Sequence, residues 1–139
     1  LRSGDGEAFY RSELARLESL IGCGDMLGAG ERAVILLGGT NPAPDPATAS
    51  SLRLFAARGA LLHAAQTPAW DPTGIEEHLD TAEALLAGVS GEDSVRAAAQ
   101  LELDRIAAIR TRTVDRMAVL EGVVRIDGTG RAGTGGPKR

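Results

Sequence analysis

The sequence predicts an all-α protein built from antiparallel helical hairpins. Apolar residues recur at a spacing of three or four along five segments, which is the pattern of one face of an α-helix. No segment keeps the alternation of apolar and polar residues, with β-branched side chains, that is typical of a strand. Aromatic side chains make up only 3% of the chain, so the core must consist mainly of Leu, Ala, Ile and Val, which suits helix-on-helix packing.

The predicted elements follow one another from a flexible lead-in to a Gly-rich tail. The helices are expected at 7–22, 26–37, 48–66, 73–87 and 92–126, between a lead-in at 1–6 and a disordered tail at 128–139. The stretch 92–126 contains no Pro and one Gly, so it is either one long helix or two helices that break near residues 111–113. We favour the break.

Glycine and proline residues separate these helices. Gly22 and Gly24 end the first helix, and Gly88 ends the fourth. The segment 38–47 contains prolines at alternate positions, which excludes both helix and strand there. A second break is expected at 67–72, where two further prolines flank an aromatic residue.

Polar residues before each apolar pattern are expected to cap the helices. Asp25 is the expected cap of the second helix, Thr48 or Ser50 of the third, and Thr73 of the fourth. Gly28 and Gly30 lie inside the second helix, and each weakens it by about 1 kcal/mol relative to Ala. The helix therefore depends on packing against its neighbours.

The short connections predict that consecutive helices pair as antiparallel hairpins at 7–37, 48–87 and 92–126. Small residues lie where a partner helix would cross, and a pair of leucines follows them in the second helix of the first two hairpins. An irregular helical bundle without repeats is the alternative architecture for this pattern.

The chain resembles a tetratricopeptide-like helical repeat. Gly24 and Asp25, with Ala29 and Ala33, match the turn and the small-residue positions of that family's second helix, and residues 57–62 are similar to its first helix. The third hairpin matches through Asp115, Ala118 and Gly122. The repeat is longer than the family's regular period of about 34 residues, and the aromatic residues of the first helix are missing. The resemblance implies a protein-binding or peptide-binding role in a bacterial regulatory protein.

The charge distribution argues against nucleic acid and membranes as direct partners. Residues 1–127 carry 19 acidic and 12 basic residues, a balance of −7, and such an acidic body repels phosphate groups. Residues 128–139 carry three basic residues. No apolar run approaches the roughly 20 residues of a membrane span. An acidic stretch at 74–104 precedes an Arg-rich stretch at 105–125, and these are either solvated helix faces or a polar docking surface.

The first residues of the sequence and the predominance of Arg among its basic residues suggest what kind of protein and organism the chain comes from. The first residue is not Met and no apolar signal-peptide core follows, which predicts a cytoplasmic domain cut from a longer protein or a processed chain. The basic residues are 14 Arg and one Lys, as in proteins encoded by GC-rich bacterial genes.

No cluster of residues predicts catalysis, a cofactor or a metal site, so we expect a protein that is not an enzyme. His63 and His78 would approach each other if the third and fourth helices pair, and Glu77 or Asp80 could then complete a metal site. No His-Glu-x-x-His or Glu-x-x-His spacing supports this, and histidines that pack or face solvent are the simpler interpretation.

Cys23 is the single cysteine, which excludes an internal disulfide. It lies in a turn before the second helix, where its thiolate would be stabilised. No histidine is near in sequence, so an incidental thiol is the simpler interpretation, and a redox-sensitive or intermolecular thiol is the alternative.

The expected activity is binding of another protein or peptide in a groove between hairpins. Trp70, in the Pro-flanked loop, either covers the core or is an exposed anchor for the partner. The other candidate contact residues are Phe55, Arg105, Arg112 and Arg116. A homodimer through residues 92–126 is a further alternative, and a small-ligand sensing domain of a transcriptional regulator is the second candidate function.

Overall fold

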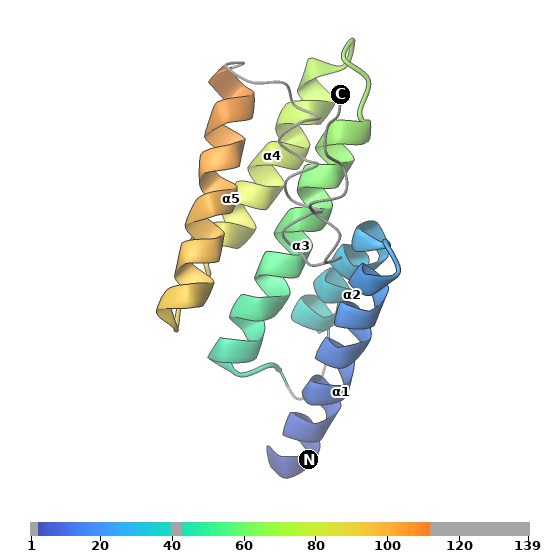
Figure 1. Ribbon diagram of the computed structural model, residues 1–139, viewed down its shortest axis with the longest axis vertical. Coiled ribbons are helices and arrows are strands. Elements are labelled where there is room, and N and C mark those ends of the chain that lie inside the picture. The colour runs from blue at the N-terminus through green and yellow to red at the C-terminus, as the bar shows by residue number, and fades with distance from the viewer. Residues whose placement is uncertain (1–2, 40–42, 112–139) are drawn as a thin grey trace, which may run out of the picture.

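The protein folds into helices only, over the residues that its computed structural model describes, which are 3–39 and 43–111 (Figure 1). The helices are α1 (Ser3–Gly22), α2 (Met26–Gly39), α3 (Pro46–Gln66), α4 (Pro72–Ala87) and α5 (Asp93–Thr111). The all-α fold class predicted from the apolar spacing is therefore confirmed. The predicted continuation of the third hairpin at 112–126 and the tail at 128–139 lie outside the described residues.

The helix boundaries differ from the prediction at the N-terminal end and at the ends of the 38–47 break, because α2 continues to Gly39 and α3 begins at Pro46, the proline that starts the helix. Helix α1 begins at Ser3, so residues 3–6 of the predicted lead-in are helical. On the inward face of α1, Tyr10 is buried with Leu17 and Ile21, while the neighbouring Phe9 is 39% exposed. Tyr10, Leu17 and Ile21 are spaced by seven and four residues, which places them on one stripe of the helix.

Aspartates cap three of the helices, and two of these caps were not predicted. Asp25 accepts a hydrogen bond from the Gly28 amide at 2.9 Å, as expected. In α3 and α4 the caps are Asp45 and Asp71, and the predicted caps Thr48, Ser50 and Thr73 are wrong. The reason is the proline that follows each aspartate: it occupies the first helical position, so the carboxylate reaches the amide two residues beyond it.

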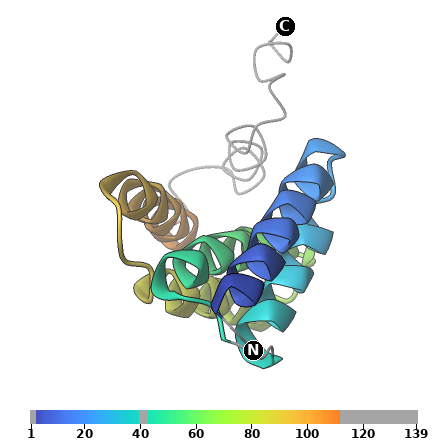
Figure 2. The ribbon, with the colours of Figure 1, turned by 90° about the horizontal axis from the view of Figure 1, so that it is seen from below.

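Helix α3 lies at the centre of the molecule and contacts α2, α4 and α5. Adjacent helices run antiparallel, and Figures 1 and 2 show α1 and α5 flanking one side of α3 while α2 and α4 pack on the other. Two clusters of buried, mainly aliphatic side chains follow from this arrangement. One cluster joins α1, α2 and α3, and the other joins α3, α4 and α5.

The backbones of α2 and α3 meet at a pair of glycines. A Cβ atom on Gly30 would lie 2.9 Å from the Cα atom of Gly59 and 3.3 Å from the carbonyl oxygen of Phe55. Only glycine allows this approach, because the neighbouring atoms belong to backbone that cannot move aside. The glycine that weakens α2 as an isolated helix is therefore the residue that lets it pack on α3.

Candidate functional site

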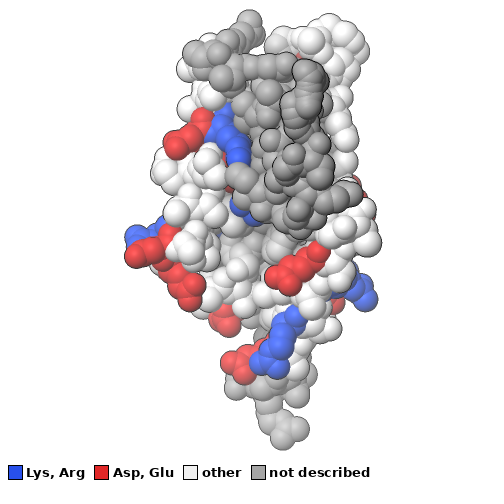
Figure 3. Space-filling view, in the orientation of Figure 1, with Lys and Arg blue, Asp and Glu red and all other residues white. Residues whose placement is uncertain are grey.

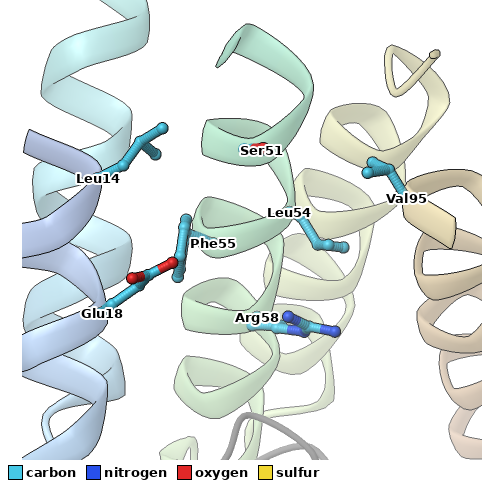
Figure 4. A pocket seen from close by; sticks show the side chains of 7 residues that line it. All are labelled: Leu14, Glu18, Ser51, Leu54, Phe55, Arg58 and Val95. Atoms are coloured by element: carbon cyan, nitrogen blue, oxygen red, sulfur yellow. The ribbon is translucent and has the colours of Figure 1, made fainter. Parts of the chain in front are cut away.

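A small cavity opens between α1, α3 and α5, and we call it the α1–α3–α5 groove. Its volume is about 180 Å³. Its walls are apolar over Leu14, Leu54, Phe55 and Val95, and its polar groups are Glu18, Ser51 and Arg58 (Figure 4). A few polar groups within an apolar lining are typical of binding sites in proteins.

Helical spacing explains why these side chains share one cavity. Four of them lie on one stripe of α3, at positions 51, 54, 55 and 58, which together span about two helical turns. Leu14 and Glu18 are one turn apart on α1, and Val95 belongs to the first turn of α5. Of the predicted partner-binding residues that the structure describes, Phe55 lines this groove, and Trp70 and Arg105 do not.

Arg58 is held in place by a buried carboxylate on α5. Its Nε atom donates to Oε2 of Glu102 at 3.0 Å, and Nη1 of Arg105 donates to the same oxygen at 2.7 Å. Glu102 has no exposed surface, and its other oxygen, Oε1, has no hydrogen-bond partner among the described residues. The ion pairs fix the guanidinium of Arg58, which forms part of the groove lining.

Arg105, one of the predicted contact residues, has a side chain that is 12% exposed and is bound to Glu102 within the protein. The sequence does not show this pairing, because it does not mark the glutamate one turn earlier on α5 as buried. Arg112 and Arg116, the other two predicted arginines, lie beyond the described residues.

The acidic stretch on α4 is partly neutralised within the molecule. Arg110 on α5 forms ion pairs with Glu76, Asp80 and Glu83, which follow one another along one stripe of α4. The hydrogen bonds that the Arg110 guanidinium donates to Glu83 and Glu76 raise its pKa above the ordinary value, although partial burial opposes this. On the face in Figure 3, acidic and basic side chains are interspersed rather than gathered in patches of one sign.

Trp70 is exposed, so the interpretation that it covers the core is wrong. Its side chain is 82% exposed in the loop between α3 and α4. The α1–α3–α5 groove uses residues 51–58 of α3, whereas Trp70 follows the end of that helix at Gln66. Trp70 and Phe55 therefore do not belong to one apolar surface.

The two histidines approach each other, as their predicted helix pairing implied. The rings of His63 and His78 stack with their centroids 5.3 Å apart and their planes at 19°. Residues 3–39 and 43–111 contain no group of three or more metal-binding side chains, so Glu77 and Asp80 do not complete a site with them. Cys23 is exposed in the turn between α1 and α2.

Comparisons with known proteins leave the site to be interpreted from its own geometry. No family model, no curated protein and no solved structure matches this chain. Within the described residues, no helix is both long enough and apolar enough to cross a membrane.

Proposed function

We propose that this is a non-catalytic interaction domain of a bacterial regulatory protein in the cytoplasm, and that it binds a segment of another protein in the α1–α3–α5 groove. In this proposal the helices form a degenerate tetratricopeptide-like array. The antiparallel packing of neighbouring helices and the glycine contact between α2 and α3 support the array.

The observation that carries the proposal is an apolar groove whose arginine is fixed by buried ion pairs. A guanidinium that is already held in one geometry loses little conformational entropy when it binds a partner. An aliphatic side chain of the partner would fill the apolar part, and its backbone or a polar side chain would meet Ser51 or Glu18.

The size of the groove favours a protein side chain over a small ligand. Its volume is about 180 Å³, whereas pockets for metabolite-sized ligands usually measure roughly 300–1,000 Å³. The alternative function, small-ligand sensing, therefore has less support. Trp70 is a second candidate anchor, for a partner that also extends over the α3–α4 loop.

The test is selection of peptides from a random display library on the full chain, with a variant that fills the groove. Ser51→Tyr adds a ring to the groove wall, and Ser12→Tyr adds the same ring to an exposed position on α1. We expect peptides with a shared motif to bind the wild-type chain and Ser12→Tyr, and to lose at least tenfold in affinity for Ser51→Tyr, about 1.4 kcal/mol. Circular dichroism checks that both variants fold.

Two results would contradict the proposal. One is a library that yields no shared motif. The other is equal peptide binding by Ser51→Tyr and Ser12→Tyr. Stabilisation of the chain by a metabolite in a thermal-shift screen, lost in Ser51→Tyr, would instead support the sensing function.

A further inference from the structure

A second cavity lies on the opposite side of α3, between α2 and α4, and we call it the α2–α4 groove. Its volume is about 130 Å³. Its floor is formed by small residues of α3, namely Ala56, Gly59 and Ala60, together with Gly30 of α2. The groove exists because these side chains are too short to fill the space above the contact between α2 and α3.

The walls of this groove expose aliphatic surface. Leu27 and Val34 line it from α2, and Leu85 lines it from α4. Val34 is 52% exposed, and the adjacent Ile35 is 58% exposed. Exposed branched aliphatic side chains beside a groove are typical of a surface that another chain covers.

Two carboxylates belong to the helices on either side of the groove. Glu31 lines the groove from α2. Glu77 is not part of the lining, but it is exposed on α4 one turn before the lining residue Thr81, so it lies on the same stripe of α4. Neither Glu31 nor Glu77 forms an ion pair with any residue that the structure describes.

The Arg side chains of the neighbouring stripes form ion pairs with carboxylates outside the groove. Arg32, next to Glu31 on α2, pairs with Glu13 of α1 at 3.0 Å. Arg110 pairs with the acids on the other stripe of α4, those that approach α5. No Lys or Arg occurs among the described residues that line the cavity. The described lining of the α2–α4 groove is therefore aliphatic, with the carboxylate of Glu31 and the stacked rings of His63 and His78, and the carboxylate of Glu77 lies beside it on α4.

We propose that the α2–α4 groove is a second docking site, and that it takes a basic segment of a partner protein with an aliphatic side chain between Lys or Arg residues. The aliphatic side chain would lie over Gly59 against Val34, and the basic residues would meet Glu31 and Glu77. A second copy of this chain fits poorly, because residues 1–127 carry a net charge of −7.

The test uses three synthetic peptides that carry the same Leu and Ile residues and differ only in the flanking positions, which are Lys, Gln or Glu. Binding to the full chain is measured by fluorescence anisotropy, and the contacted residues are mapped by amide chemical shifts. We expect the Lys peptide to bind most tightly and to shift amides around Gly59 and Val34. We also expect its affinity to fall as NaCl rises from about 0.05 M to about 0.5 M, because salt screens exposed charges.

A pair of charge-matched variants separates the groove from the overall charge of the protein. Glu31→Gln with Glu77→Gln removes the carboxylate in the groove and the one beside it, and Glu7→Gln with Glu92→Gln removes two exposed carboxylates elsewhere. We expect the first pair to weaken the Lys peptide about threefold to tenfold, and the second pair to change its affinity less than about twofold. Val34→Ser is expected to weaken all three peptides, because it removes apolar contact.

The proposal is overturned if the Gln or Glu peptide binds as tightly as the Lys peptide, or if both variant pairs weaken binding equally. Amide shifts confined to the α1–α3–α5 groove would also overturn it. Ser51→Tyr should leave Lys-peptide binding unchanged. The test of this second site is therefore independent of the test of the function proposed for the α1–α3–α5 groove.

Discussion

Glu102 carries its carboxylate at a position with no exposed surface, in contact with Arg58 and Arg105. A buried ion pair adds little net stability, because desolvation of the charges offsets their attraction. Removal of one partner is different, since the remaining charges stay buried without compensation. The cluster therefore fixes geometry: it positions Arg58 in the groove and joins α5 to α3.

Glu102→Ala is expected to lower the free energy of unfolding by about 3–5 kcal/mol, because it leaves two arginines without their shared carboxylate. The matched control is Arg96→Ala, which removes a surface pair with Asp93 on the same helix. That change should cost about 0.5 kcal/mol or less. Urea denaturation followed by circular dichroism measures both values, and similar small losses would contradict the structural role of Glu102.

Trp70→Ala is expected to change the free energy of unfolding by less than about 0.5 kcal/mol, because the side chain is 82% exposed. The fluorescence of this single tryptophan should be quenched by acrylamide almost as efficiently in the native as in the unfolded chain. Protection from quenching in the native chain would mean that the indole is covered.

The helix caps show how local sequence rules compete. Asp45 and Asp71 are each followed by proline, and the structure places the cap at the aspartate rather than at a later Thr or Ser. We expect Asp45→Ala to cost about 1 kcal/mol. Thr48→Ala should cost less than about 0.5 kcal/mol, since the hydrogen bond from the amide of residue 48 to Asp45 survives this substitution. Equal losses of unfolding free energy for the two variants in a denaturation experiment would show that Thr48 caps the helix as strongly as Asp45 does.

The contact between α2 and α3 predicts opposite effects for two glycines of one helix. Gly30→Ala should destabilise the protein by about 1–3 kcal/mol, because its Cβ atom would press on the backbone of Gly59. A Cβ atom at Gly38, in the same helix, meets nothing within 4 Å. Gly38→Ala should therefore leave stability unchanged or raise it by up to about 1 kcal/mol. A stabilising Gly30→Ala would contradict the close helix contact.

The sequence predicted the helices well because each one carries its own apolar period and its own breaks. It could not predict which glycine is a helix contact, because that depends on Gly59, which belongs to another helix. The charged groups of the groove were missed for the same reason. Arg58 and Glu102 are 44 residues apart, and nothing local to either residue marks them as partners.

At the scale of the whole molecule, stability should fall in acid. Hydrogen bonding to Arg32 lowers the pKa of Glu13 below its ordinary value of 4.5, and the Thr48 amide lowers the pKa of Asp45 below 3.8. Both carboxylates therefore stabilise the native state above those values, and this contribution is lost as the pH falls through their native pKa values.

The variant Glu13→Gln with Asp45→Asn tests this dependence. We expect it to be less stable than the wild type at neutral pH, and the difference should shrink as the pH falls below about 4.5. Urea denaturation at several pH values measures the difference. A gap that stays constant into the acid range would show that these two carboxylates do not control the acid sensitivity.

Because α3 forms a wall of both grooves, the proposed occupants would be separated by the thickness of one helix, about 10 Å. Two different chains held so close would act on each other at a very high effective concentration, even if neither binds the other alone. If both proposals hold, the domain would keep two different protein segments within reach of each other.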